Sequence, residues 1–477
     1  MTSGSRPLRI VMFVQNDVTR DSRVLREAAT LAGAGHAVTV VGRLPRRSEP
    51  PVQEHERDGF RILRVVPPIA WESRWRWLTH PWRRRRWLVT RAKRSLTAPP
   101  PLIPVHLATT GALAAVTVAL SLVRSPFYLR TRNRPEPPGG TTLDWLARWR
   151  GATLGWARQV AGLAPDADVW HGHDLNALPA AVHAAESRGG LVVYDSHEIF
   201  MDSGSNAARP WWARAFFRRF ERQLARRAAA LVTVNDALAA ILGPRLGIPR
   251  TVVVHNAPAR PTTPIAPTGR LRAATGTTQG DPLVLYHGGF SPHRGLEELA
   301  EAILQPGLDR AHVAFLGYGT LRERLAALAA EPRFDGRVHV VEAVPPDELL
   351  GWVADADVAA MPIQASTLNH RLSTPNKLFE SLAAGVPVVA SDLPGMRPIV
   401  TGDPAGPLGE LCDPTDAASI AAAIRRILDR SPEERAALRE RCRTAAIERW
   451  NWETESARLV SLYEELAREL PSGAADA

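Results

Sequence analysis

Short apolar runs alternate with helical patterns along the first half of the chain. Residues 8–14 (LRIVMFV) form a continuous apolar run, which is typical of a strand buried on both faces of a parallel sheet. Asp21 and Ser22 offer an N-cap for a helix with one apolar face, and a second strand is predicted at residues 37–41. Further strand-like runs lie at residues 169–170, 191–194 and 231–234. The alternation predicts a doubly wound α/β domain.

A stretch rich in proline, threonine and glycine separates this pattern from a second one of the same kind. Strand-like runs then recur at residues 283–286, 313–316, 338–341, 358–361 and 386–390, with helical patterns at 296–303 and 321–330. Two such units predict a cleft between them, with ligands at the carboxyl ends of the strands. The expected parts are an N-terminal Rossmann-like domain (1–258), a linker (259–281), a C-terminal domain (282–448) and a helix (449–470) that packs back on the N-terminal domain.

An insert at about residues 70–150 interrupts the first alternation. Its residues 70–98 place five tryptophans among nine arginines and lysines, against one glutamate. A solvated face would not need the tryptophans, and nothing else in the sequence suggests base readout by a nucleic-acid-binding patch. Indoles favour the membrane interface, and basic residues favour an anionic surface. We therefore expect no nucleic-acid partner but docking on an anionic membrane through Trp71, Trp75, Trp82, Trp87, Arg83, Arg84, Arg85 and Arg86.

The second part of the insert, residues 105–123, contains 19 residues without a charge. As a helix it would span about 28 Å, which is just enough for the hydrocarbon core of a bilayer. A single crossing would put the two halves of the first sheet on opposite sides of the membrane. A re-entrant or surface-lying hairpin avoids this problem, and the sequence leaves the choice open.

Composition limits the class of protein. The 477 residues are 45% apolar and 23% charged, which excludes a wholly disordered, collagen-like or coiled-coil chain. The net charge is +10, and most of the surplus lies in residues 70–98. Two cysteines, Cys412 and Cys442, exclude a disulfide scaffold and suit a reducing compartment. Because no apolar signal core opens the sequence, we expect a cytoplasmic protein associated peripherally with the inner face of the cell membrane.

The segment 373–392 (STPNKLFESLAAGVPVVASD) carries the most informative chemistry. Thr374 can cap a helix, and Pro375 suits its first position. Asn376 and Lys377 then lie in the first turn, where unpaired N–H groups present partial positive charge and Lys377 adds a full one. This arrangement predicts a phosphate site. One turn later, a glutamate can accept hydrogen bonds from sugar hydroxyls.

This segment resembles the donor site of the family 4 retaining glycosyltransferases, which have the GT-B fold. Matching pieces follow in the family's order at residues 286–302 (YHGGFSPHRGLEELAEA), 315–319 (FLGYG), 354–362 (ADADVAAMP) and 409–416 (GELCDPTD). In the first domain, DSRVLREAATLAGAGHAVTVV, DVWHGHDLNALPA and VVYDSHEIF resemble a subgroup that acts in polysaccharide or glycolipid assembly. The resemblance implies two Rossmann-like domains facing a cleft. It also implies transfer of a sugar from a nucleotide diphosphate to an acceptor hydroxyl, with retention of the anomeric configuration.

The resemblance also assigns roles to residues. Arg294, Lys377 and the helix amides would stabilise the charge that develops on the departing diphosphate. Glu380 would hold the ribose, and His197 would be a positioning residue near the donor sugar and the leaving phosphate. The expected catalytic residues are thus His197, Arg294 and Lys377. The expected donor-binding residues are Gly288, Gly289, Arg294, Gly317, Asn376, Lys377 and Glu380, and the acceptor-side candidates are Asn16, Asp17, His173 and Asp174.

Two positions depart from the family pattern. The family has two glutamates separated by seven residues, and the first of them falls on Leu372. The arginine of the glycine-rich turn falls on Gly289, while Arg294 takes the place of the family lysine. Because the first glutamate helps to hold the donor sugar in the family, sugar recognition must differ here. The identity of the base and of the sugar does not follow from the sequence.

No metal or other cofactor is expected, since the nucleotide-sugar is a substrate and the two cations serve the diphosphate. Two aspartate pairs, at residues 166 and 168 and at 355 and 357, mimic a metal-binding DxD motif, but each precedes an apolar strand, where capping is common. The expected partners are a nucleotide-sugar donor and a glycan or lipid-linked acceptor. Two alternatives stay open: a nucleotide-sugar epimerase on the same fold, and a membrane-bound assembly protein whose donor site has decayed.

Overall fold

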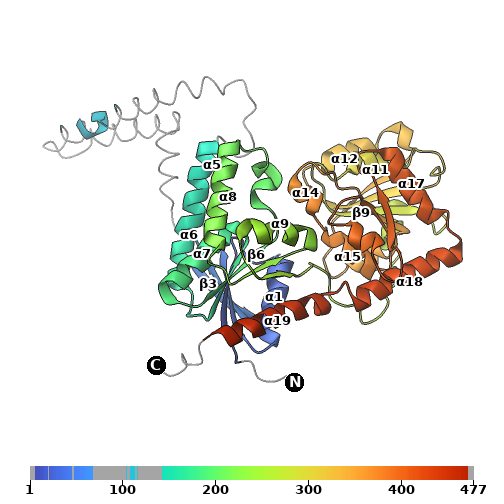
Figure 1. Ribbon diagram of the computed structural model, residues 1–477. Helices are drawn as coiled ribbons and strands as arrows, with labels where there is room; N and C mark the ends of the chain where they lie inside the picture. The colour runs from blue at the N-terminus through green and yellow to red at the C-terminus, as the bar shows by residue number, and fades with distance from the viewer. Residues whose placement is uncertain are drawn as a thin grey trace.

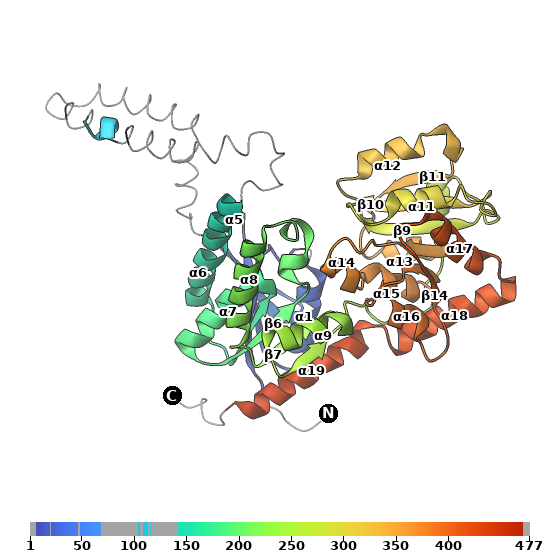
Figure 2. The same ribbon diagram turned by 45° about the horizontal axis from the view of Figure 1, so that its top comes forward.

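The computed structural model describes residues 6–67 (without 20, 46 and 47), 104, 108–112, 115 and 142–470. In this part of the chain two α/β domains lie side by side, and long C-terminal helices run from the C-terminal domain back to the N-terminal domain (Figures 1 and 2). This arrangement agrees with the two Rossmann-like domains expected from the sequence.

The N-terminal domain is built on an eight-stranded sheet with the order β3-β4-β2-β1-β5-β6-β7-β8. Its strands are β1 (Arg9–Phe13), β2 (Ala37–Arg43), β3 (Val52–Arg57), β4 (Phe60–Val65), β5 (Val169–His173), β6 (Leu191–Ser196), β7 (Ala230–Thr233) and β8 (Thr251–Val253). All neighbours pair in parallel except β3 and β4, which form an antiparallel edge hairpin. The alternation of apolar runs did not predict this hairpin, because β3 is largely exposed. The Asp58-Gly59 turn, with φ of 49° and 79°, was the available signal.

Helices cover both faces of the N-terminal sheet. One face packs against α1 (Ser22–Gly33) and α19 (Trp452–Glu469). The other face packs against α6 (Trp156–Leu163), α7 (Asp174–Arg188), α8 (Trp211–Ala225) and α9 (Asp236–Leu246). A short π-helical stretch (Arg150–Gly155) joins α5 (Thr142–Trp149) to α6, and two 3-10 turns (Phe200–Asp202 and Gly204–Asn206) precede α8.

The C-terminal domain is built on a six-stranded parallel sheet with the order β11-β10-β9-β12-β13-β14. Its strands are β9 (Leu283–Gly289), β10 (His312–Tyr318), β11 (Val338–Glu342), β12 (Val358–Met361), β13 (Val388–Ser391) and β14 (Gly409–Cys412). Its helices are α10 (Arg270–Thr275), α11 (Leu296–Ala302), α12 (Arg322–Ala329), α13 (Leu349–Val353), α14 (Leu368–Leu372), α15 (Asn376–Ala383), α16 (Arg397–Thr401), α17 (Ala417–Leu428) and α18 (Pro432–Glu448), with a 3-10 turn at Pro332–Phe334.

The predicted linker, residues 259–281, contains a helix that belongs to the C-terminal domain. Helix α10 forms inside it, and Leu271 is buried in the core of the C-terminal domain. The two carboxylate oxygens of Asp355 accept hydrogen bonds from the backbone N–H groups of Gly269 (2.7 Å) and Leu271 (2.8 Å). Composition alone could not show this, because the aspartate that fixes the start of α10 lies far away in the sequence.

The C-terminal helix α19 packs on the N-terminal domain. The indole N–H of Trp452 donates to Thr30 Oγ1 (2.9 Å), and the hydroxyl of Tyr463 lies 2.7 Å from His171 Nδ1. The apolar side of α19 completes the core beside α1. The chain therefore crosses between the domains twice, before α10 and again before α19.

The expected membrane-docking residues Trp71, Trp75, Trp82, Trp87, Arg83, Arg84, Arg85 and Arg86 lie outside the described residues. The uncharged stretch 105–123 also lies outside them, apart from residues 108–112 and 115. Within the described part of the chain, no helix combines the length and the apolar character needed to cross a bilayer.

Candidate active site

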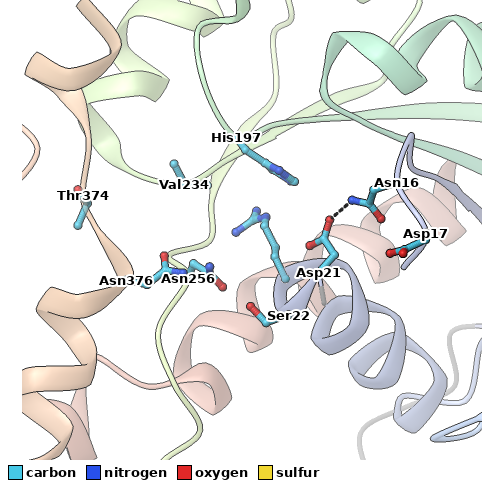
Figure 3. Close-up of a pocket in the computed structure, with 10 residues that line it drawn as sticks. Asn16, Asp17, Asp21, Ser22, His197, Val234, Asn256, Thr374 and Asn376 are labelled. Carbon is cyan, nitrogen blue, oxygen red and sulfur yellow. Dashed lines mark hydrogen bonds between the residues drawn. The ribbon is translucent and has the colours of Figure 1, made fainter. Parts of the chain in front are cut away.

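A cavity of about 550 Å³ lies between the two domains. Side chains from both domains face it, and Figure 3 shows the start of α1 and His197 opposite the start of α15. The lining residues are Asn16, Asp17, Asp21, Ser22, Arg23, His197, Val234, Asn256, Thr374 and Asn376. Most of them follow the carboxyl ends of strands, where parallel α/β sheets bind ligands.

The start of α15 has no side-chain cap. Pro375 occupies the N-cap position, so the helix begins one residue later than the sequence predicted. The expectation that Thr374 caps this helix was wrong, because its hydroxyl donates instead to the carbonyl of Gly395 (2.5 Å). The N–H groups of the first turn, at Asn376 and Lys377, are thus available to an anion in the cleft.

Lys377 projects from this turn without a carboxylate partner among the described residues. Its ammonium lies 3.4 Å from the centroid of the Tyr286 ring, as a cation–π contact. Burial and the charge of Arg294 hold the pKa of Lys377 well below its usual value, although Glu380 acts in the opposite direction. An anion bound here would raise the pKa of Lys377, as Glu380 does.

Arg294 is a second cation whose charge acts on Lys377, although neither side chain is among the residues that line the cavity. Its Nε donates to Ser291 Oγ (3.2 Å), and no acidic side chain of the described chain forms an ion pair with it. Burial, together with the charges of Arg294 and His293, lowers the pKa of His370 to about 4. The guanidinium thus adds to the positive field around Lys377 and His370.

Glu380 lies one turn along α15 and is held by its neighbours. Its Oε2 lies 3.0 Å from His287 Nε2. Burial raises the pKa of this carboxyl, but the hydrogen bond from His287 and the charges of Lys377 and Arg26 outweigh burial. The pKa is therefore below its usual value, and Glu380 is a carboxylate. A carboxylate in this position can accept hydrogen bonds from the hydroxyls of a ligand.

Glycines bring the ends of β9 and β10 close together beside Lys377. A Cβ on Gly317 would lie 2.0 Å from the carbonyl oxygen of Gly288, so this approach requires glycine. A Cβ on Gly288 (φ 105°) would lie 3.4 Å from the Lys377 ammonium. At Gly289, where the family has an arginine, a Cβ would meet nothing within 4 Å.

On the opposite wall, two carboxylates hold His197. Its Nδ1 lies 3.2 Å from Asp174 Oδ2, its Nε2 lies 3.1 Å from Asp195 Oδ2, and its backbone N–H donates to Asp174 Oδ1 (3.0 Å). Burial lowers the pKa of His197, but the two carboxylates outweigh it and raise the pKa well above the usual value. The side chain is therefore an imidazolium whose position in the cavity is fixed.

The four acceptor-side candidates occupy two kinds of position. Asn16 and Asp17 line the cavity, and Asn16 Nδ2 donates to Asp21 Oδ2 (2.7 Å; Figure 3). His173 and Asp174 are not among the lining residues. His173 is only 1% exposed and lies with Nδ1 3.2 Å from Asp195 Oδ2. The structure thus places His173 and Asp174 around His197 rather than at the cavity surface.

The sequence analysis missed a buried ion pair behind His197. Arg23 Nε and Nη2 donate to the two oxygens of Asp195 (3.0 and 3.1 Å), and Nη1 donates to the carbonyl of Val254 (2.7 Å). Arg23 Nε also lies 3.0 Å from Glu27 Oε1. The available signal was the i,i+4 pair Arg23 and Glu27 on the same helical face as Val24, but such a pair usually lies in solvent.

Buried histidines and carboxylates in this network have the chemistry of metal ligands. One oxygen or nitrogen atom from each of Glu27, His171, His173 and Asp195 lies within 4.8 Å of the others. The guanidinium of Arg23 contacts both carboxylates, however, so a positive charge already compensates them. Burial and the charge of Asp195 raise the pKa of Glu27, and the charge of Arg23 lowers it. The resulting pKa is about 8, so the Glu27 carboxyl is largely neutral at pH 7.

Leu372, at the position of the missing family glutamate, is not among the residues that line the cavity. Leu372 ends α14, is 5% exposed and packs into the core of the N-terminal domain. Its carbonyl accepts a hydrogen bond from Asn235 Nδ2 (2.8 Å), and Asn369 Oδ1 accepts one from the backbone N–H of Ile199 (3.1 Å). In this chain α14 therefore ties the two domains together.

Family comparisons cover both domains. Residues 281–430 match the family described as "Glycosyl transferases group 1", and residues 129–257 match the "Glycosyl transferase 4-like domain". Together the two matches span more than half of the chain.

Similar proteins are sugar transferases. The chain is 27% identical over 319 residues to the MMP alpha-(1->4)-mannosyltransferase of Mycolicibacterium hassiacum, covering 65% of this chain and 73% of that protein. It is 28% identical over 326 residues to the phosphatidyl-myo-inositol mannosyltransferase of Mycobacterium leprae, covering 63% and 74%.

Solved structures show the same fold at low sequence identity. Sucrose-phosphate synthase from Thermosynechococcus elongatus superposes with a TM-score of 0.65 at 18% identity, covering 98% of this chain and 100% of that one. HepE of Anabaena, in complex with UDP and glucose, superposes with a TM-score of 0.59 at 15% identity, covering 96% and 100%. With both domains matched and the site at the expected cleft, the chain belongs to the family 4 retaining glycosyltransferases of the GT-B fold, enzymes that transfer a sugar from a nucleotide-sugar donor.

Proposed function

We propose that this glycosyltransferase works without a metal ion at the inner face of the cell membrane and delivers its sugar to a lipid-linked or envelope-glycan acceptor. The observation that carries the donor half of the proposal is Lys377, a half-buried side chain near Arg294 that has no ion-pair partner in the described chain. Two neighbouring cations at the open start of a helix suit a diphosphate.

The donor diphosphate lies, in this proposal, between the start of α15 and Arg294. As the bond between the sugar and the diphosphate oxygen breaks, negative charge grows on the leaving group, and Lys377, Arg294 and the α15 amides stabilise it. Glu380, oriented by His287, accepts hydrogen bonds from the ribose hydroxyls. These cations supply the charge that a divalent metal supplies in other transferases.

The opposite wall positions the sugar and receives the acceptor. His197, held by Asp174 and Asp195, is a positioning residue beside the sugar and the leaving phosphate. Asn16 and Asp17, at the cavity wall, are the acceptor-side contacts. A lipid-linked acceptor is supported by the name of the phosphatidyl-myo-inositol mannosyltransferase, and a UDP-type donor by the HepE complex.

Membrane association rests on the composition of the insert. Five tryptophans and nine basic residues within residues 70–98 suit an anionic interface. Reversing the charges of Arg83, Arg84, Arg85 and Arg86 should release the protein from membranes, as measured by fractionation. Unchanged membrane association would contradict this part of the proposal.

Calorimetric titration with UDP, GDP and ADP tests the donor site. One of them should bind, and Lys377→Met should abolish binding, whereas Arg324→Met on the exposed side of α12 should not. Binding of none of the three would indicate a decayed site.

Turnover with nucleotide-sugars and membrane lipids should release the nucleotide diphosphate only when an acceptor is present, which an epimerase would not do. Activity should persist in EDTA, and loss of activity that added metal restores would contradict the metal-free proposal.

A further inference from the structure

The first two turns of α8 expose large aromatic side chains. Trp211 is 80% exposed, Phe216 is 55% exposed and Trp212 is 40% exposed. No other segment of the described chain gathers three exposed large apolar residues within six positions. An exposed apolar cluster of this size is a typical mark of an interaction surface.

These aromatic residues are not the ones that pack α8 on its own domain. The inner face of α8 is occupied by Phe217 and Phe220, which contact Trp145 and Trp149 of α5 at ring-centroid distances of 4.6–5.5 Å. Figure 1 shows α5 and α8 side by side. Helix α8 therefore has an inner aromatic face that packs on its own domain and an outer, exposed one, whose Phe216 contacts only Phe217 and Phe220 of the same helix among the described aromatic rings.

Arginines surround the outer aromatic face. Arg214, Arg218 and Arg245 converge on the buried carboxylate of Asp202, so that three positive charges face one negative charge. The guanidinium of Arg218 contacts both oxygens of Asp202 (3.0 and 3.1 Å), and that of Arg245 lies 3.7 Å away. Farther along α8, Arg219 and Arg222 are exposed. The surface therefore carries a clear surplus of positive charge.

The position of this surface relates it to the active site. The chain leaves β6 at Ser196, passes His197 in the cavity and reaches α8 at its first turn, before returning to β7. The first turn of α8 thus lies at the carboxyl edge of the sheet, which is also the edge of the cavity. Strand β4 is parallel to β2 and also ends at this carboxyl edge, and α5 is the next long helix of the described chain.

We propose that the outer face of α8 (Trp211, Trp212 and Phe216, with Arg214, Arg218 and Arg245) docks on an anionic phospholipid bilayer, with the aromatic rings at the interface and the guanidinium groups on lipid phosphates. Indoles prefer the interface, and each basic residue near an anionic surface adds to the attraction. The surplus of arginines over the single carboxylate of Asp202 favours an anionic surface over an apolar protein partner. The inference deepens the proposed function, in which the acceptor is at the membrane, but it concerns a surface separate from the insert.

The first test compares two apolar-to-acidic changes in the full-length protein. Trp211→Glu should weaken partitioning onto vesicles of phosphatidylcholine and phosphatidylglycerol in equal parts by about tenfold. Leu163→Glu, at an apolar position that is 50% exposed at the other end of the same domain, should leave partitioning unchanged. Because both side chains are exposed, thermal unfolding should not change. Equal partitioning of Trp211→Glu and the wild type would overturn the proposal, since the insert alone would then hold the protein.

The second test reports contact directly. Both natural cysteines are buried, and burial raises the pKa of each thiol to about 12, so a cysteine introduced by Ala215→Cys on the outer face can be labelled selectively with a polarity-sensitive dye. Its emission should shift to the blue when the mixed vesicles are added, and it should not shift with pure phosphatidylcholine. Dye attached through Ala436→Cys, on an exposed position of α18, should not respond.

The outcomes separate this inference from the proposed function. No shift with anionic vesicles, or a shift that grows with protein concentration in their absence, would overturn the membrane assignment, and the second result would favour contact between two copies. Donor binding is measured without vesicles. A protein that binds no nucleotide but still shows the dye response would therefore overturn the proposed donor chemistry and support the docking surface.

Discussion

The two walls of the cleft differ in whether their charged side chains have ion-pair partners within the protein. On the N-terminal wall, Arg23 pairs with Asp195, and His197 is held between Asp195 and Asp174, so cations and carboxylates balance within the protein. On the C-terminal wall, behind Asn376, the charge of Arg294 lowers the pKa of Lys377, and neither side chain has an ion-pair partner in the described chain. The balanced wall fixes geometry before any ligand arrives, whereas the unbalanced wall gains its missing negative charge only from a ligand.

The largest expected effect concerns the balanced wall. Arg23→Met should lower the free energy of unfolding by about 3–5 kcal/mol, because Asp195 would stay buried without its guanidinium partner. Arg57→Met, which removes an exposed ion pair, should change it by less than about 1 kcal/mol. Urea denaturation measures both. Equal losses in the two variants would remove the contrast between the walls.

The next effect concerns the unbalanced wall. Lys377→Met should lower kcat/KM by about 10²–10³-fold, because it removes a cation from the leaving diphosphate. Without ligand, the variant should unfold at the same or a higher temperature than the wild type, since the half-buried Lys377 has no ion-pair partner in the described chain. Steady-state kinetics and thermal unfolding give the two values. A marked fall in thermal stability would mean that Lys377 supports the fold rather than the ligand.

A smaller effect follows from Glu27, whose raised pKa makes the balance of its wall depend on pH. The folded protein keeps the Glu27 proton up to about pH 8, whereas the unfolded chain releases it near 4.5, so this carboxyl costs stability as pH rises between the two values. In Glu27→Gln there is no proton to lose. The free energy of unfolding of Glu27→Gln relative to the wild type should therefore rise by about 1 kcal/mol per pH unit in that window. A difference that is independent of pH would show that Glu27 is ionised when folded.

The smallest effect concerns the support of His197. Asp174→Asn removes one of the two carboxylates that raise the pKa of His197, so the alkaline limb of the pH–activity profile should move to lower pH. Asparagine tolerates the left-handed backbone of this position (φ 57°), and the loss at neutral pH should be about tenfold or less. An unmoved alkaline limb would mean that the charge of His197 does not matter for the reaction.

Patterns local to the sequence predicted the frame of the molecule. Apolar runs predicted most of the parallel strands, because strands buried on both faces must be apolar throughout. The segment that begins at Ser373 predicted a phosphate site at a helix start, and the structure places Lys377 and Glu380 in adjoining turns of α15. The patterns did not predict β3, which is largely exposed, or β8, which is only three residues long.

Only the tertiary structure decided which side chains meet across long distances in the chain. Arg23 and Asp195 are 172 residues apart, and neither position indicates the other, so the sequence could not show that they form a buried pair. In the same way, His173 and Asp174 became supports of His197, and Leu372 packed into the opposite domain. The physical reason is that periodicity and capping depend on neighbours along the chain, whereas the partner of a buried charge depends on how the sheets and helices pack.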